Sequence, residues 1–321
     1  MAVEQVPVAS EVPPAVCLMG PTASGKTALA VALARRYPFE IISVDSAQVY
    51  RGLDIGTAKP SPELRREVPH HLVDIVEPTE AYSAARFRQD ALAAMREITR
   101  AGKIPLLAGG TMLYFRALLQ GLSELPAASP EIRQRLDAQA REAGWPALHR
   151  RLSEVDPAAA GRIHPHDSQR IQRALEVWEL TGQPMTELYA SAADLPLEYR
   201  VIRLAVAPAE RAELHRRIGE RFHAMMADGF EHEVAALMSR PGMATSLPAM
   251  RAVGYRQLAE YLAGQRGREE AIERGIIATR QLAKRQLTWL RRESGLYWLD
   301  SDDQALFSRT VSYLQGAGVS L

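Results

Sequence analysis

A glycine-rich segment near the start of the chain constrains its fold more than any other feature. The segment reads GPTASGKT and fits the pattern G-x-x-x-x-G-K-[ST]. An apolar run, Ala15 to Met19, precedes it, and an Ala- and Leu-rich helical pattern, Thr27 to Arg36, follows it. This order predicts a strand, a turn and a helix, and the run Glu40 to Val44 adds a second strand, which completes a βαβ unit. The segment consists of Gly20, Pro21, Thr22, Ala23, Ser24, Gly25, Lys26 and Thr27.

The residue types of this segment point to a diphosphate ligand. Gly20 and Gly25 let the backbone curl so that successive N–H groups face one anion-sized hollow, and the following helix adds the positive end of its dipole. Lys26 counters the charge of the terminal phosphate, and the Thr27 hydroxyl is placed to bind a Mg²⁺ ion that bridges two phosphates. We therefore expect the segment to bind diphosphate, with Mg²⁺ as cofactor and Thr27 as its ligand.

The rest of the chain divides into a core and an insertion. Residues 1–14 contain three prolines and no periodicity, so we expect a disordered tail. A helical pattern at Ala84 to Arg100 and further strand candidates at Ile104 to Ala108, Val201 to Val206 and Leu296 to Leu299 follow. Their alternation in residues 15–121 and 199–321 predicts an α/β core with a parallel sheet. Between them, residues 122–198 show helical pattern and no strand candidate, which predicts an all-helical insertion domain.

Composition excludes several other classes of protein. The 321 residues are 47% hydrophobic and 24% charged, values typical of globular chains and not of collagen or disordered chains. No apolar run is long enough to span a membrane, and residues 1–15 lack a signal-peptide pattern, so we expect a cytoplasmic protein with no membrane partner. The single cysteine, Cys17, lies in an apolar run and is expected in the core.

An acidic residue follows the second predicted strand. Asp45 stands at the carboxyl end of that strand, where open α/β sheets place reacting groups, so it is a candidate general base. The alternative is an Asx turn or a helix cap. The strand Ile104 to Ala108 ends in Gly109-Gly110-Thr111 rather than in an aspartate, which argues against a hydrolytic NTPase.

The later motifs resemble one family. The resemblance begins with the glycine-rich segment and extends over about residues 15 to 300. Together the segments are similar to bacterial tRNA dimethylallyltransferases, and their order is more specific than the glycine-rich loop alone. They are GPTASGKT at 20–27, SVDSAQVY at 43–50, DIGTAK at 54–59, GGTMLY at 109–114, RIHP at 162–165, QRIQRALE at 169–176, RAVGYRQ at 251–257 and KRQLTW at 284–289.

The resemblance implies a fold and a reaction. The fold is a P-loop NTPase-like parallel sheet flanked by helices. The reaction transfers the dimethylallyl group of dimethylallyl diphosphate to N6 of the adenine at position 37, 3′ to the anticodon, in tRNAs that read codons beginning with U. It releases diphosphate and consumes no ATP. The partners are therefore dimethylallyl diphosphate and the anticodon stem-loop of tRNA, which the insertion would grip, and we expect a monomer.

The resemblance also implies roles for individual residues. The catalytic aspartate is Asp45, and Thr27 and Arg217 contact the diphosphate. Taken alone, Arg217 fits a surface arginine equally well, and Arg170 and Arg173 fit helix salt bridges with Glu176. The implied tRNA contacts are Asp45, Ser46, Ala47, Gln48, Thr111, Arg133, Gln169, Arg170, Ile171, Gln172, Arg173, Arg251, Gly254, Tyr255, Arg256, Lys284 and Arg285.

Charge distribution agrees with a nucleic-acid partner, although the formal net charge is only +1. Residues 274–292 contain six basic side chains and no acidic one, at a spacing that predicts a helix docked by its apolar face with a basic exterior. Two other functions remain open at this point. A P-loop small-molecule or nucleotide kinase would also use the βαβ unit and Asp45, and a non-enzymatic RNA-binding protein would also use the basic helix.

Overall fold

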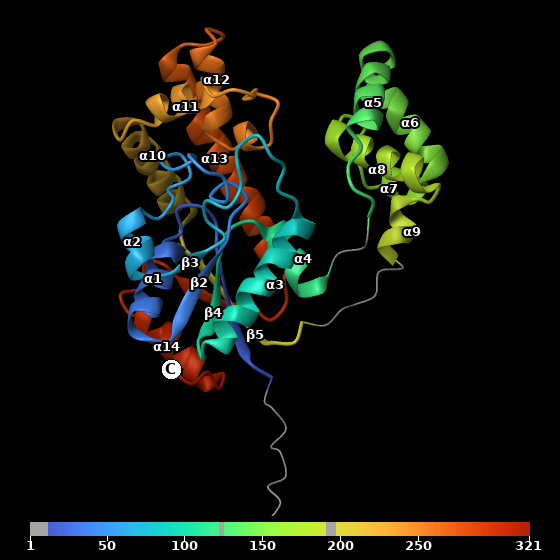
Figure 1. Cartoon of the computed structure of the whole chain (residues 1–321). Helices are drawn as coiled ribbons and strands as arrows, with labels where there is room; N and C mark the ends of the chain where they lie inside the picture. Colours follow the sequence, from blue (N-terminus) through green and yellow to red (C-terminus); the bar gives the residue numbers. More distant parts are fainter. Residues whose placement is uncertain (1–11, 122–124, 191–196) are drawn as a thin grey trace, which may run out of the picture. The chain divides into compact units, whose positions relative to one another are not determined.

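The computed structural model describes residues 12–121, 125–190 and 197–321. Six strands form one sheet in the order β3-β2-β4-β1-β5-β6, and every pair of neighbours is parallel. The α/β class and the parallel sheet are thus confirmed (Figure 1). The strands are β1 (Pro14–Met19), β2 (Phe39–Val44), β3 (His70–His71), β4 (Ile104–Gly109), β5 (Arg200–Ala207) and β6 (Tyr297–Asp300).

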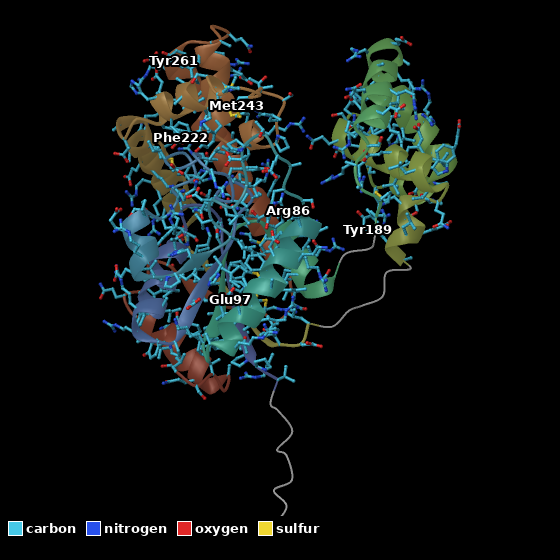
Figure 2. All side chains as sticks on the ribbon, viewed as in Figure 1. Arg86, Glu97, Tyr189, Phe222, Met243 and Tyr261 are labelled. Carbon is cyan, nitrogen blue, oxygen red and sulfur yellow. The ribbon has the colours of Figure 1, made fainter. Side chains whose placement is uncertain are left out.

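Helices flank this sheet. The helical pattern at 84–100 is confirmed as α3, whose buried side chains Phe87, Ala91 and Ile98 recur at helical spacing. Phe222 of α10, labelled in Figure 2, lies edge-on to Phe230 of α11 with ring centroids 6.1 Å apart. The helices of the core are α1 (Lys26–Arg36), α2 (Pro62–Glu67), α3 (Ala84–Arg100), α4 (Met112–Gln120), α10 (Arg211–Ala227), α11 (Phe230–Met238), the 3₁₀ turn η1 (Ala249–Arg251), α12 (Tyr255–Leu262), α13 (Arg268–Leu290) and α14 (Leu306–Gly316).

The strands at the centre of the sheet are apolar because both faces are covered. In β1, residues 15–19 are almost fully buried, and Val16 and Leu18 pack in one cluster with Leu29 and Leu33 of α1. Near-continuous apolar runs are typical of parallel strands buried on both sides. Cys17 lies among them, as predicted, and burial raises the pKa of its thiol to about 12.

The chain separates into two compact units. One consists of residues 1–118 and 197–321, and the other of residues 119–196. The second unit has its own apolar core, in which Leu136, Leu152 and Ile171 are fully buried. Its described residues form helices only: α5 (Pro130–Ala143), α6 (Trp145–Val155), α7 (Pro157–Ala160), α8 (Ser168–Thr181) and α9 (Met185–Ala190).

Two details differ from the sequence-based expectations. The strand β3 was not predicted, because two residues carry no periodic signal. Pro14 was assigned to the tail but begins β1, since an extended backbone suits proline at the first residue of a strand. The remainder of the predicted tail, residues 1–11, lies outside the described residues. None of the helices in the described ranges is long and apolar enough to cross a membrane.

Candidate active site

The site lies where β1, β2 and β4 end. These strands are neighbours in the sheet, and their carboxyl ends lead into the glycine-rich loop, into Asp45 and into Gly109–Thr111 respectively. Ligands in open α/β sheets bind at this edge. Three segments that are far apart in sequence are therefore brought together by the strand order.

The glycine-rich loop is tightly packed. A Cβ on Gly20 would lie 2.4 Å from the Val206 carbonyl oxygen, so only glycine fits there. Gly25 caps α1 with a φ of 82°, in the left-handed region that favours glycine. The next N–H groups, those of Lys26 and Thr27, belong to the first helical turn and have no carbonyl within the helix to bind. N–H groups at the positive end of a helix are suited to bind an anion.

One N–H group of the loop does not face this site, contrary to the prediction for the whole segment. The backbone N–H of Thr22 donates to the side chain of Gln286, 2.9 Å away. The N–H of Ser24 donates within the loop to the Pro21 carbonyl at 3.3 Å. These two N–H groups of the loop are thus bonded within the protein.

Lys26 points back over the loop. Its ammonium group donates to the Pro21 carbonyl at 3.0 Å. Although the residue keeps some exposed surface, desolvation of this group lowers the pKa of Lys26 to about 8, against the opposing effect of the Asp45 carboxylate. A cation held in so little water attracts a diphosphate strongly.

Asp45 has one oxygen committed to the backbone. Its Oδ1 accepts hydrogen bonds from the N–H groups of Ala47 and Gln48, at 2.8 and 3.3 Å. The Asx-turn interpretation is therefore correct for this oxygen. The turn fixes the carboxylate at the end of β2, near enough for its charge to act on Lys26 and on Arg221.

Arg221 was not recognised from the sequence as a site residue. It lies on the inner side of α10, where burial lowers the pKa of its guanidinium and Asp45 opposes that effect. An arginine at helical spacing with Leu214, Ile218 and Phe222, all buried, was the available signal. Lys26, Arg221 and Asp45 form the charged centre of the site.

Arg217 is bonded to three side chains of the protein. Its guanidinium donates to Glu213 at 2.7 Å, to the Ser301 hydroxyl at 3.0 Å and to Asp302. Ser301 in turn lies beside the glycine-rich loop, because its Cβ would be 4.0 Å from a Cβ on Gly25. The contact of Arg217 with diphosphate stays a prediction, and Arg221, one helical turn later, is a second cation close enough for the charge of Asp45 to act on it.

Thr111 joins the β4 loop to the β2 loop. Its Oγ1 accepts from the backbone N–H of Ser46 at 3.1 Å, and its own N–H donates to the Val44 carbonyl at 3.2 Å. Ser46 is exposed and Ala47 partly so. Thr111 thus lies beside Ser46, which follows Asp45 in the chain, and the contact of Thr111 with the target nucleotide stays a prediction.

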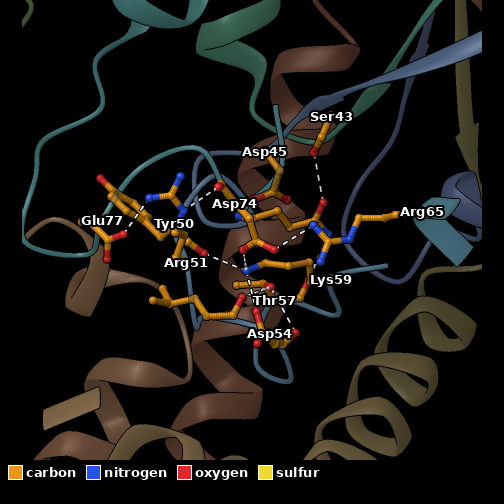
Figure 3. Close-up of polar contacts among 12 residues, drawn as sticks. Ser43, Asp45, Tyr50, Arg51, Asp54, Thr57, Lys59, Arg65, Asp74 and Glu77 are labelled. Carbon is orange, nitrogen blue, oxygen red and sulfur yellow. Dashed lines mark hydrogen bonds and ion pairs between the residues drawn. The ribbon is translucent and has the colours of Figure 1, made fainter. Parts of the chain in front are cut away.

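The loop that follows Asp45 is held by a buried lysine (Figure 3). Lys59 has a side chain that is 2% exposed, and its ammonium group donates to the Tyr50 carbonyl at 2.7 Å and to Asp54 and Asp74 at 2.5 Å each. Gln48 braces the same loop, because its Nε2 donates to the Thr57 carbonyl at 3.2 Å. Gln48 is therefore engaged within the protein.

A second carboxylate holds the turn in this loop. Glu233 of α11 accepts from the backbone N–H groups of Asp54, Ile55 and Gly56 at 3.0, 2.7 and 3.2 Å. It also accepts from the Tyr255 hydroxyl at 2.5 Å. Burial and Glu233 raise the pKa of Tyr255, which keeps this hydroxyl a donor.

The tRNA contacts expected in the core fall into two groups. Arg251, Arg256, Lys284 and Arg285 are exposed. Tyr255, by contrast, is fully buried. Its expected contact with tRNA is wrong, because the ring packs on Phe230 at 4.9 Å.

Gly254 is buried as well. It begins α12 with a φ of 92°, and a Cβ there would lie 2.8 Å from the Phe230 ring. Its N–H donates to Gln257 at 2.8 Å. The motif around Gly254 therefore shapes the backbone from which Arg251 and Arg256 project.

The tRNA contacts expected in the second unit also include both buried and exposed residues. Ile171 is fully buried, so its expected contact with tRNA is wrong. Arg133 and Arg173 both pair with the buried carboxylate of Glu176, at 2.8 and 2.6 Å, which is the salt-bridge alternative for Arg173. The pairing holds the pKa of Glu176 below its usual value.

The remaining residues of this group lie at the start of α8. Gln172 donates to Asp137 at 2.7 Å and is engaged within the unit. Gln169 and Arg170 are exposed, and Arg170 pairs with Asp167 at 3.1 Å. Gln169 and Arg170 therefore stay available to a ligand, because a surface ion pair of this kind is weak.

Comparison with known proteins agrees with this geometry. A family described as IPP transferase matches residues 48–293, and one described as isopentenyl transferase matches residues 14–76. The chain belongs to the IPP transferase family. It is 62% identical to the tRNA dimethylallyltransferase of Alkalilimnicola ehrlichii over 307 residues, which cover 95% of this chain and 96% of that protein.

Solved structures of the family have the same fold. The tRNA isopentenylpyrophosphate transferase of Bacillus halodurans is 37% identical with a TM-score of 0.69, covering 94% of this chain and 96% of that one. A eukaryotic dimethylallyltransferase that acts on tRNA is 26% identical with a TM-score of 0.79, covering 96% and 81%. As a member of the IPP transferase family, the chain is a transferase with tRNA dimethylallyltransferase activity.

Proposed function

We propose that this enzyme transfers the dimethylallyl group from dimethylallyl diphosphate to N6 of the adenine at position 37, directly 3′ to the anticodon. Its substrates are tRNAs that read codons beginning with U, and its products are N6-(dimethylallyl)adenosine and diphosphate. The observation that carries the proposal is the position of Asp45. Its carboxylate is fixed by a turn at the end of β2, near enough for its charge to act on Lys26 of the glycine-rich loop and on Arg221.

The reaction breaks the bond between the allylic carbon and the diphosphate oxygen and forms a bond from that carbon to N6. Positive charge develops on the allyl group and negative charge on the leaving diphosphate. The first-turn N–H groups of α1, Lys26 and Arg221 stabilise the leaving charge. The Asp45 carboxylate accepts a hydrogen bond, and then the proton, from the amine as the new bond forms.

The donor groups at the loop suit Mg²⁺. Thr27 is exposed at the first turn of α1 and offers a hydroxyl oxygen, the ligand type that this hard ion prefers. Within the described ranges no group of three or more acidic, histidine or cysteine side chains is arranged to hold a metal. Mg²⁺ commonly keeps water and phosphate oxygens as its other ligands. We propose that Thr27 holds Mg²⁺, which neutralises diphosphate charge when bound.

The pKa of Lys26 predicts a pH dependence. Its folded pKa, about 8, lies below the ordinary value of 10.5, so the free enzyme loses this charge as the pH rises through 8. We expect kcat/KM for dimethylallyl diphosphate to fall about tenfold between pH 7 and pH 9. Steady-state kinetics over this range test the expectation. Lys26→Arg keeps its charge at pH 9, so a decline that persists unchanged in Lys26→Arg assigns the titration to another group.

We propose that the exposed cations of both units bind the tRNA backbone. We expect Arg170→Ala and Lys284→Ala to weaken tRNA binding several-fold and to reduce the slope of log Kd against log salt by about one each. Affinity for dimethylallyl diphosphate stays unchanged. Filter binding of labelled tRNA at several salt concentrations measures the Kd for tRNA and its salt slope, and the same assay with labelled dimethylallyl diphosphate measures the second affinity. Arg309→Ala of α14 is the matched control. An equal loss for both ligands would contradict a role confined to tRNA.

We propose that the unit of residues 119–196 grips the anticodon stem-loop. Replacing residues 122–198 by a short Gly/Ser linker is expected to leave the α/β core folded, because each unit has its own apolar core. The shortened protein should bind dimethylallyl diphosphate with Mg²⁺ and lose most of its tRNA affinity. Titration of both ligands, after circular dichroism shows a cooperative thermal unfolding transition, tests this. Undiminished tRNA binding would assign the RNA site to the core alone.

A direct assay separates this function from the kinase alternative. The enzyme is incubated with unmodified tRNA and either labelled dimethylallyl diphosphate or labelled ATP. Prenyl incorporation without phosphorylation supports the proposal, whereas phosphorylation without prenyl incorporation supports a kinase.

We also propose a cytoplasmic monomer, because tRNA is the substrate and one chain supplies Lys26, Asp45, Thr111 and Arg221. Light scattering tests the monomer.

A further inference from the structure

One buried amide joins two loops of the site to the helix that carries exposed basic side chains. Gln286 of α13 is 9% exposed. Its Oε1 accepts the hydrogen bond from the backbone N–H of Thr22 in the glycine-rich loop, at 2.9 Å. Its Nε2 donates to the carbonyl oxygen of Gly110, at 2.8 Å. Lys284 and Arg285, two residues and one residue before it, are exposed.

The groups around Gln286 match the hydrogen-bonding capacity of an amide side chain. A Cβ on Gly110 would lie 2.4 Å from Nε2, so the glycine leaves the space that the side chain fills. The two loop groups differ, because Thr22 supplies a donor and Gly110 an acceptor. Only a side chain with both an acceptor and a donor at one end satisfies the pair, and glutamine has both. Losing either bond leaves a buried backbone group without its partner.

The two loops have different tasks. The loop that contains Thr22 continues into Lys26 and the anion site, and Gly110 precedes Thr111, which is bonded to Ser46 beside Asp45. Gln286 therefore sets the distance between the glycine-rich loop, which is proposed to hold the leaving diphosphate, and the loop of Gly110 and Thr111, which is proposed to lie next to the acceptor nucleotide. A displacement of α13 by docked RNA moves the amide and, with it, both loops.

We infer that Gln286 is a positioning residue that couples tRNA docking on α13 to the binding of diphosphate at the glycine-rich loop. This inference rests on the proposed role of Lys284 and Arg285 as tRNA contacts. Gln286 acts through Thr22 and Gly110 and touches neither substrate. Binding coupling is reciprocal, so diphosphate must strengthen tRNA binding by the same factor.

The test measures binding without turnover. Inorganic diphosphate with Mg²⁺ is titrated by calorimetry into the full-length enzyme, with and without unmodified tRNA. We expect the wild type to bind diphosphate at least about fivefold more tightly when tRNA is present. Gln286→Met should lose this difference, while its tRNA affinity without diphosphate stays within about threefold. Gln281→Met, an exposed glutamine on the same helix, is the matched control and should keep the difference.

A second variant protects the test against loss of folding. Gln286→Glu keeps the shape and the acceptor for Thr22, but its carboxylate cannot donate to Gly110. Burial beside the Gly110 carbonyl favours the protonated form of this carboxyl and so raises its pKa above the ordinary value. We expect the coupling to be lost at pH 8 and to return as the pH is lowered and the carboxyl, once protonated, donates again. Coupling that is absent from the wild type, or present in Gln286→Glu at every pH, would overturn the inference. An enzyme that shows the coupling but transfers no prenyl group would instead overturn the proposed function.

Discussion

Replacing Asp45 by asparagine is expected to lower turnover by about 10²-fold or more. Asparagine keeps an Oδ1 that accepts from Ala47 and Gln48, so the turn at the end of β2 survives. It lacks the carboxylate that accepts the proton from N6. Binding of tRNA should stay within a few-fold, because the backbone contacts are elsewhere. Single-turnover transfer with preformed enzyme–tRNA complex measures the chemical step.

Asp45→Ala separates chemistry from loop structure. Alanine lacks the carboxylate and also the acceptor of both backbone hydrogen bonds. If Asp45→Ala loses more turnover than Asp45→Asn, the difference measures the contribution of the turn. Asp228→Asn, at an exposed aspartate beyond α10, is the matched control and should behave as the wild type. A turnover in Asp45→Asn equal to that of the wild type would remove Asp45 from the reaction.

The second large effect distinguishes two arginines on α10. Arg221→Met is expected to lower kcat/KM for dimethylallyl diphosphate by about 10²-fold, because it removes a desolvated cation from the leaving group. Arg217→Met should change it by less than about threefold, because Arg217 is held by Glu213 and Asp302. Both variants replace an arginine by methionine on one helix, so each controls for the other. Equal defects, or a defect in Arg217→Met alone, would restore the original assignment to Arg217.

Much of the fold could be predicted because its signals are local. Apolar runs followed by turns located five of the six strands, and the pattern at 84–100 has the same bounds as α3. The order of the strands in the sheet has no such local signal. The sequence of β4 does not indicate that this strand lies between β2 and β1, yet this position brings Asp45, Lys26 and Thr111 together.

The candidate site was predicted in part. Residue types with one obvious chemistry, such as Lys26 in its loop and Asp45 after a strand, were identified. Arg221 was missed because its spacing places it among the buried residues of α10, where a core role is the ordinary expectation. Ile171 and Tyr255 were assigned to tRNA because every residue of a motif was given the same role. Both are fully buried, so they support the surface from which the exposed residues of their motifs project.

Glu233 has a consequence for ligand choice. The successive N–H groups of Asp54, Ile55 and Gly56 converge as those of a phosphate-binding loop do, and they form a second anion nest. The protein fills this nest with its own carboxylate, tied down by Tyr255. A diphosphate that approaches the loops therefore meets one nest already neutralised and another, at residues 25–27, still open. Glu233 thus leaves the three N–H groups of this turn with no free capacity to bind a phosphate oxygen.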